Sequence, residues 1–407
     1  MAGMRRYAAV LSEPHVRGLV AGAFLSRAPA GIEPLAVVLT IRELGWSYVA
    51  AGGVAAALAG GVAVAGPLTA RLVDRLGARR VVAPLALLHA ASILALVALG
   101  HRGAPPLALV PLATLAGASF PPVAGVLRAL WPALLGERRE LLVAAFALDS
   151  VLVELIFTLG PLLAALVAAV GAPSWALIAS AGFAVTGSLA FATRAPVRTY
   201  APAVQHGRET GGRLGALRSP GVRTLALVML PIGFCIGSIE VAFPAFGEAL
   251  GSRALGGPLL AAWSIGSGIG GLAFGARAPA ASGRALVVLA AAMPLATMPL
   301  ALATSFWAMA PLAVLAGLAI APLMITANQL IGGVAPRGAL TEAYVWPLTA
   351  LFAGVALGNG ASGALIDHLD WHAAFVAATA VGCAAVLVAY LRRATLAAAR
   401  VATSAAA

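Results

Sequence analysis

Long runs of apolar residues alternate with short polar breaks along the whole chain. Each run is close to the twenty residues that an α-helix needs to cross the hydrocarbon layer of a bilayer. This pattern predicts an all-α integral membrane protein with twelve transmembrane helices. The predicted spans cover residues 18–40, 48–70, 81–99, 106–127, 142–170, 174–192, 222–246, 255–276, 285–304, 306–331, 342–366 and 372–391.

The composition agrees with a membrane protein. Of the 407 residues, 61% are apolar and only 10% are charged, whereas about a quarter of a soluble globular chain is charged. The basic N-terminal stretch precedes an apolar run longer than the core of a signal peptide, so we interpret it as a retained tail. Cys235 and Cys383 lie in separate apolar runs without the spacing of a metal site, and we expect both to be inert.

The arginines are concentrated on one side of the predicted membrane. If the N-terminus lies in the cytoplasm, only Arg42, Arg102 and Arg253 face outward, and Arg27 lies within a span. This distribution obeys the positive-inside rule and places both termini in the cytoplasm. It also explains the net charge of +12 without a nucleic-acid partner. Because the chain lacks lysine and is rich in alanine, we expect a protein of the inner (plasma) membrane of a bacterium with a GC-rich genome.

The chain divides into two similar halves. We predict an N-terminal six-helix bundle at 1–192, a cytoplasmic linker at 193–221 that is rich in Pro, Gly and Arg, and a C-terminal six-helix bundle at 222–407. The segments GIEPLAVVL and SIEVAFPAF, which contain Glu33 and Glu240, resemble each other at matching places in the first span of each half. Such matching is expected of parallel repeats that are related by an axis along the membrane normal.

The loop between spans two and three carries the most specific motif, GPLTARLVDRLGARRVV. It resembles the signature loop of the major facilitator superfamily, Gly-x-Leu-Ala-Asp-Arg-x-Gly-Arg-Arg, although Ala70, Val73 and Ala78 depart from that pattern. The alternative interpretation is an ordinary positive-inside loop with one incidental acid. The positions that match are Leu72, Asp74, Arg75, Gly77 and Arg79.

This resemblance implies two pseudo-symmetric six-helix bundles and transport by alternating access. It also implies a cytoplasmic latch in which the loop, with Asp74, Arg75, Gly77 and Arg79, contacts the start of span eleven near Glu342. A helix N-terminus favours a nearby acid, which supports the latch physically.

Two further features bear on the resemblance to transporters of this superfamily. Gly160-Pro161 in span five partly resembles a motif of proton-driven exporters, but alanines follow where that motif has further glycines. The arginine that such exporters carry within span four is missing, because Arg128 stands at the cytoplasmic end of that span.

Charged side chains inside the spans are the candidate site. A charge at the centre of a bilayer costs about 2.5–3.5 kcal/mol on insertion scales, so such residues normally face a partner or a wet cavity. Arg27 and Glu33 are six residues apart and do not share a helix face. Counted from the cytoplasmic ends at about 1.5 Å per residue, Asp149 lies about 10 Å deep, Arg27 about 14 Å and Glu154 about 18 Å. We therefore expect Arg27 to meet Asp149 and Glu154 at the cavity wall.

The role of this cluster has two interpretations. Either it is a polar contact that holds the helices together, or its carboxylates exchange protons as the cavity opens alternately to the two sides of the membrane. We place Glu33 on the cavity wall further from the cytoplasm, with Glu240 of span seven opposite it. Alternatively, Glu33 could bind a cationic substrate directly. His89 is interpreted as a helix-packing residue of a peripheral span.

Other residues are assigned simpler roles. We interpret Trp131, Trp175 and Trp371 as anchors at the membrane interfaces, and Trp263 and Trp346 as residues of the cavity. The glycine spacings in AGGVAAALAGG and GSGIGGLAFG predict close helix packing.

The function that these patterns favour is secondary transport. We expect a monomeric transporter in the lipid bilayer that exports a small organic molecule, with the proton gradient as the driving force and no cofactor or metal. The alternatives are proton symport or facilitated uptake of a metabolite, a membrane enzyme, or a non-transporting sensor on the same scaffold. No GxxxxGK[ST] loop is present in the sequence, which argues against direct use of ATP.

Overall fold

The computed structural model describes residues 8–136, 138–199, 215–277, 281–336 and 340–396. Within these ranges the regular secondary structure is helical. Twelve segments are long and apolar enough to cross a membrane, and each predicted span overlaps one of them. The all-α fold with twelve candidate spans is therefore confirmed.

The helices of the first half build six spans. Their bounds are α2 Val16–Arg27, α3 Pro29–Glu43, α4 Tyr48–Leu76, α5 Ala78–His101, α6 Pro106–Ala118, α7 Val123–Leu135, α8 Arg139–Val170 and α9 Ser174–Ala192, followed by the short α10 Ala195–Thr199.

The second half repeats this arrangement. Its helices are η1 Ala216–Arg218, α11 Pro220–Ala249, η2 Arg253–Leu255, α12 Gly256–Arg277, α13 Gly283–Thr297, η3 Met298–Leu302, α14 Phe306–Gly317, α15 Ile320–Val334, α16 Leu340–His368, α17 Trp371–Arg392 and η4 Arg393–Leu396. The predicted boundaries at residues 192 and 222 remain predictions, because residues 200–214 of the linker lie outside the described part.

Spans four and ten show the internal repeat in detail. Each is broken into two helices, α6 and α7 in the first half and α14 and α15 in the second. Each break follows a glycine, Gly117 or Gly317, that is packed against the backbone of a neighbouring helix so closely that no side chain would fit. The neighbouring helices are α4 and α12, the second span of each half. Glycines at corresponding positions of the two halves therefore allow span four to cross span two, and span ten to cross span eight, at close distance.

Glycine contacts also fix other helix crossings. Gly31 of α3 and Gly160 of α8 lie against each other's helix, and Gly22 of α2 lies against Gly187 of α9. A Cβ atom at any of these positions would collide with main-chain atoms of the partner helix. Close approach at small residues is the usual basis of helix packing in membranes. The predicted close packing of the glycine-rich segments is confirmed at Gly61, and also at Gly266 and Gly270, which lie against α14 and the residue that follows it.

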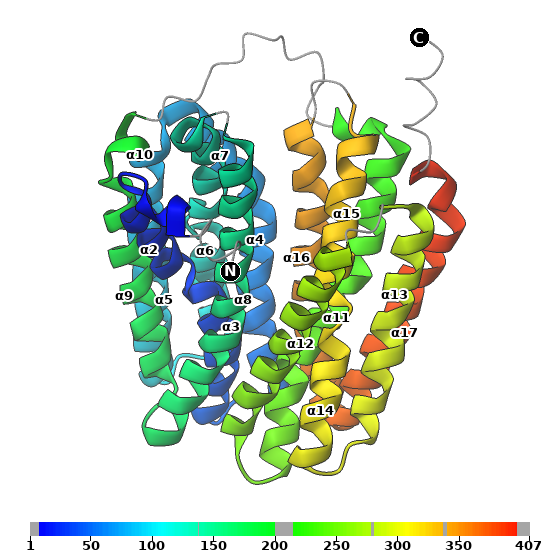
Figure 1. The fold of residues 1–407 in the computed structure, drawn as a ribbon. Helices are drawn as coiled ribbons and strands as arrows, with labels where there is room; N and C mark the ends of the chain where they lie inside the picture. Colours follow the sequence, from blue (N-terminus) through cyan, green and yellow to red (C-terminus); the bar gives the residue numbers. More distant parts are fainter. Residues whose placement is uncertain (1–7, 137, 200–214, 278–280, 337–339, 397–407) are drawn as a thin grey trace.

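The two halves lie side by side with all spans running between two ends of the molecule (Figure 1). We call the end where α9 stops and α11 starts the linker end, and the opposite end, where α3 passes into α4, the loop end. The halves meet mainly through α4 with α16 and α8 with α12, and α3 also contacts α11. In Figure 1 the ribbons of the halves approach each other in the lower part, at the loop end, and diverge towards the linker end at the top.

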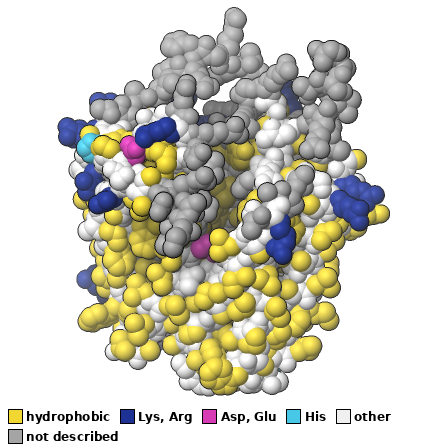
Figure 2. Space-filling model, in the orientation of Figure 1, with side chains coloured by type: hydrophobic (Ala, Val, Ile, Leu, Met, Phe, Trp, Pro, Cys, Tyr) yellow, Lys and Arg dark blue, Asp and Glu magenta, His cyan; other side chains and the backbone are white. Residues whose placement is uncertain are grey.

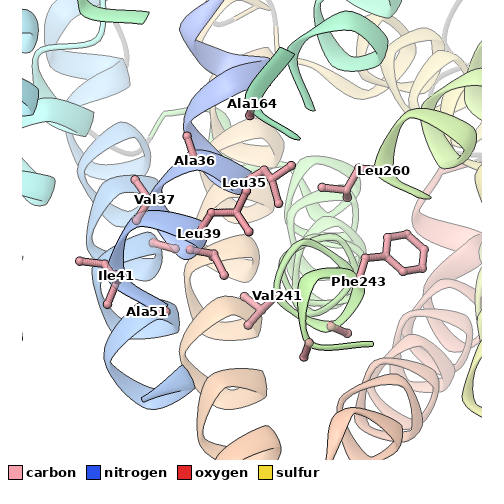
Figure 3. Packing of buried hydrophobic residues seen from close by; sticks show 14 of the residues in the cluster. Leu35, Ala36, Val37, Leu39, Ile41, Ala51, Ala164, Val241, Phe243 and Leu260 are labelled. Atoms are coloured by element: carbon pink, nitrogen blue, oxygen red, sulfur yellow. The ribbon is translucent and has the colours of Figure 1, made fainter. Parts of the chain in front are cut away.

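The apolar core shows that the halves pack together at the loop end. One cluster of buried side chains there is continuous across the halves and joins Leu35 and Ala164 to Val241 and Leu260 (Figure 3). At the linker end the buried side chains form two separate clusters. One contains residues of the first half only and the other residues of the second half only. The molecule is therefore closed at the loop end, and its surface is hollowed between the halves towards the linker end (Figure 2).

Candidate functional site

Span one carries two buried charges on different faces. Pro29 begins α3 directly after α2, and Pro34 lies inside α3, so the span lacks two backbone N–H donors. Arg27 and Glu33 are both buried and contact different helices, as their spacing predicts. Arg27 therefore links span one to α8, and Glu33 links it to α5 and α9.

Arg27 forms an ion pair with Asp149 of α8. Its Nη1 atom donates to Oδ1 of Asp149 at 2.5 Å, and Asp149 is only 2% exposed. The predicted contact between these residues is confirmed. The other carboxylate oxygen, Oδ2, accepts from Nε of Arg128 at 2.7 Å. Both oxygens of Asp149 are thus occupied by guanidinium groups, and a proton on Asp149 would displace one of these bonds.

The contact of Arg128 was missed by the sequence analysis. Arg128 lies on α7, and its side chain is 52% exposed while its Nε reaches the buried Asp149. A long arginine side chain at the end of a span can place its charge well away from its own Cα atom. The depth of a residue along its helix gives the position of its Cα atom and not that of a long side chain. Counting depths therefore did not predict the contact between Arg128 and Asp149.

Glu33 is buried inside the first half. We expected it on the cavity wall opposite Glu240, but its Oε1 atom contacts Nε2 of His89 on α5 at 2.9 Å and the hydroxyl of Ser180 on α9 at 3.0 Å. Glu33 is 2% exposed and His89 is fully buried. The expected position was wrong because the face of α3 that carries Glu33 packs against α5 and α9.

The tautomer of His89 follows from its neighbours. Nδ1 lies 2.9 Å from the carbonyl oxygen of Ala116, which can only accept, so Nδ1 carries a proton. One further proton lies between Nε2 of His89 and Oε1 of Glu33, and on either atom it leaves the pair with no net charge. A pair with no net charge is well suited to this buried site. This geometry agrees with the interpretation of His89 as a packing residue.

Glu154 faces the second half of the molecule. It lies on α8 and is half-buried, and its carboxylate interacts with the hydroxyl of Ser267 on α12. Its Oε2 atom lies 3.5 Å from the position that a Cβ atom of Gly268 would occupy. Among the described residues, no ion pair involves Glu154. The expected contact between Arg27 and Glu154 is therefore not formed.

Glu154 is the innermost of a row of contacts between α8 and α12. Nearest the loop end, Gly257 lies against Ala165. Thr158 donates to Ser264 at 3.2 Å one step further in. Glu154 and Ser267 follow towards the linker end. A carboxylate at this position changes its surroundings whenever α8 and α12 separate.

Glu240 lies on α11 within the second half and interacts with the side chain of Asn359 on α16. Asn359 is 2% exposed, and its Oδ1 atom has no hydrogen-bond partner in the described part of the chain. Among the described residues, Glu33 and Glu240 form no hydrogen bond with each other, because Glu33 contacts His89 and Ser180 and Glu240 interacts with Asn359. Glu240 is thus a second carboxyl group without an arginine among the described neighbours.

Polar contacts across the halves at the loop end were not predicted. Glu248 of α11 accepts from Nη2 of Arg42 at 2.9 Å and from the hydroxyl of Tyr48 at 2.7 Å. Arg253 also donates to Glu248, at 2.7 Å. Asp367 of α16 accepts from the backbone N–H groups at the start of α4. The sequence contains one signal for these contacts. Arg42 and Arg253 are two of the few arginines that face outward, and each is expected to pair with an acidic side chain.

The predicted latch at the linker end remains a prediction. The side chains of Asp74 and Glu342 lie outside the described residues. Arg75 and Arg79 are exposed. Gly77 ends α4 and precedes α5 with φ of 83°, a conformation that favours glycine. Gly77 therefore makes the turn between α4 and α5.

The tryptophans divide into several environments. Trp131 is fully buried in the linker-end core of the first half, so its interpretation as an interface anchor was wrong. Trp175 is 69% exposed, as expected of an anchor. Trp371 packs on Phe246, with ring centroids 4.9 Å apart. Trp263 lies where α12 crosses Gly317, on the side of α12 that faces α14.

No group of three His, Cys, Asp or Glu side chains in the described residues is arranged to hold a metal ion. The candidate site is therefore a set of carboxyl groups, two of which, Glu154 and Glu240, lack an arginine partner in this part of the chain.

Comparison with known proteins identifies the family. The model of the Major Facilitator Superfamily matches residues 19–293, which is more than half of the chain. The chain belongs to the major facilitator superfamily. No curated protein matches it.

Solved transporters of similar fold agree with this assignment. The chain superposes on a point mutant of the nucleoside transporter NupG with a TM-score of 0.75 at 14% identity, covering 93% of this chain and 99% of that one. It superposes on a bacterial homologue of the iron transporter ferroportin in an inward-facing state with a TM-score of 0.68 at 14% identity, covering 96% and 99%. A POT family transporter in complex with a thioalcohol-conjugated peptide gives 0.68 at 14%, covering 92% and 94%. These similarities show the fold, and the family indicates membrane transport rather than catalysis.

Proposed function

We propose that this chain is a secondary transporter that moves a small organic molecule by alternating access, with Glu154 as the group that couples transport to protons. The observation that supports this most directly is the place of Glu154. It lies at the contact between α8 and α12, where the two halves meet, and it has no ion pair with an arginine among the described residues.

Proton coupling follows from the cost of burying a charge. When α8 and α12 close around Glu154, an ionised carboxylate loses water, and protonation removes that cost. When they separate towards one side, water reaches the group and the proton can leave. Asp149 suits this role less well because both of its oxygens bind arginines. Glu33 suits it less well because it is enclosed with His89 inside one half.

The conformation described here is inward-facing under this proposal. Arginines concentrate at the linker end, which is the cytoplasmic side by the positive-inside rule. On the face shown in Figure 2 the lowest third is mainly hydrophobic, and the basic side chains lie above it. The hollow between the halves then opens to the cytoplasm, from which an exported molecule would enter. Export is also supported by the resemblance of Gly160-Pro161 to the exporter motif.

Transport by purified protein in liposomes tests the proposal. A panel of organic cations, nucleosides and short peptides would be measured with a pH gradient imposed in each direction, which separates export by exchange from uptake by symport. We expect Glu154→Gln to lose transport driven by the gradient while it keeps exchange of substrate at equal concentrations. Glu43→Gln, the same chemical change at an exposed residue at the end of α3, is the matched control.

The outcomes are distinct. If Glu154→Gln accumulates substrate against a gradient as well as the unmodified protein does, Glu154 is not the coupling group. The same assay on Glu240→Gln then tests the second carboxyl group. A protein that moves none of the compounds under any gradient would favour the sensor on the same scaffold.

A further inference from the structure

The start of α4 is completed by a residue of the other half. The first N–H groups of any α-helix have no partner within the helix. In α4 the third of them, that of Ala50, is bound by the hydroxyl of Ser47, the cap residue of the same helix. The first two, those of Tyr48 and Val49, are bound by Asp367 of α16, at 2.8 and 2.6 Å.

The approach of the helices places Asp367 at this position. α4 and α16 run in opposite directions and are closest at Gly52 and Gly363, where a side chain on either glycine would collide with the other helix. One turn from this contact towards the loop end leads to Tyr48 on α4 and to Asp367 on α16. The two glycines therefore bring the carboxylate to the helix N-terminus, where its charge is also favoured by the helix dipole.

This contact links the halves and does not stabilise either half by itself. The hydrogen bonds recorded for the Asp367 side chain go to α4 of the first half. The site is at the surface, where Asp367 and Val49 are exposed, so water can replace the carboxylate when the helices separate. Two hydrogen bonds at an exposed site can stabilise the conformation that is closed at the loop end and can still break when the helices separate.

We propose that Asp367 is a conformational latch that holds the loop end closed by capping α4 across the two halves. The proposal rests on alternating access and adds a residue that sets the balance between its states. When the loop end opens, Tyr48 and Val49 lose their carboxylate and α16 moves away from α4. Asp367→Asn removes the charge and leaves a single acceptor, and we expect it to increase the population open at the loop end about tenfold.

Distances between spin labels measure this population directly. Labels at Arg102→Cys and Thr304→Cys report the loop end, because both residues are exposed there in opposite halves. Labels at Arg80→Cys and Arg284→Cys report the linker end in the same way. Cys383 is exposed and would be replaced by serine, whereas Cys235 is buried.

Two matched controls separate the latch from general effects on helix ends. Asp370→Asn removes the same group three residues away, where Asp370 caps α17 within its own half through the N–H of Ala373. Ser47→Ala removes the cap of α4 that comes from its own half. We expect Asp367→Asn to lengthen the loop-end distance and shorten the linker-end distance, and both controls to resemble the unmodified protein.

Hydrogen exchange and salt provide independent measures. Exchange of a peptide that spans residues 46–52 should rise in Asp367→Asn. High salt should shift the unmodified protein in the same direction, and the variant less, because salt screens an exposed charge.

Each outcome decides the question. Unchanged distances in Asp367→Asn, or an equal shift in Asp370→Asn, would overturn the latch. Neither result would contradict the proposed role of Glu154 in proton coupling. A single, invariant distance in every variant would overturn both the latch and alternating access. Gradient-driven transport that persists in Glu154→Gln, together with the expected shift of the distances in Asp367→Asn, would overturn only the proposed function.

Discussion

The pair of Glu33 and His89 allows a sharp prediction about buried polar groups. Because the carbonyl of Ala116 requires a proton on Nδ1, the bond between Nε2 and Oε1 contains one proton. Glutamine has nearly the same shape as glutamate, and its amide N–H can donate to an unprotonated Nε2 of His89. We therefore expect Glu33→Gln to lose at most about 1 kcal/mol of the free energy of unfolding.

Glu33→Ala removes the partner altogether. The ring nitrogen of His89 is then buried without a hydrogen bond, which costs about 1–3 kcal/mol. The missing side chain also leaves a cavity among α3, α5 and α9, and large-to-small changes in a core cost about 2–5 kcal/mol. Since the cavity is small and polar, we expect a total loss of about 3 kcal/mol.

Unfolding in detergent with increasing denaturant, followed by circular dichroism, measures these losses. A double-mutant cycle with His89→Ala should give a coupling energy of about 1–3 kcal/mol for the pair. The reasoning is refuted if Glu33→Gln is as unstable as Glu33→Ala, because an uncharged amide that donates to Nε2 of His89 would then be unable to replace the carboxyl group.

Two further predictions follow from the other buried contacts. Asp149→Asn leaves the buried Arg27 without its counter-charge, so we expect a loss of about 3–5 kcal/mol in the same unfolding assay; Arg128→Gln, at a side chain that is 52% exposed, should lose clearly less, and equal losses would contradict this account. Gly160→Val places a side chain against the backbone of Gly31 and should abolish monodisperse protein in size-exclusion chromatography, whereas Gly53→Ala, with no atom within 4 Å of the added Cβ, should elute like the unmodified protein.

The candidate site was predictable only in part. Arg27 was expected to meet Asp149 because depth along two helices can be counted from the sequence, and the contact is present. Glu33 was placed wrongly because rotation of a helix about its axis decides which neighbour a residue faces. Asp367 and Glu248 stand near helix ends, where an acid looks like part of an ordinary polar loop.

The sequence by itself determined the number of spans and the family signature, and the pattern of charge predicts the direction of the spans through the membrane. These properties depend on local features: the length of an apolar run, the side on which arginines collect, and a motif of about ten residues.

Only the tertiary structure decided which charges are partners and which end of the molecule is closed. A carboxylate finds its partner by distances of a few ångströms between helices that are far apart in sequence, as Glu33 and His89 do. The closed end depends on which surfaces of two rigid halves are in contact, and the same sequence must permit more than one answer if the protein transports. The balance between the two conformations depends on contacts between the halves, such as the contact of Asp367 of α16 with the start of α4, and no local pattern encodes it.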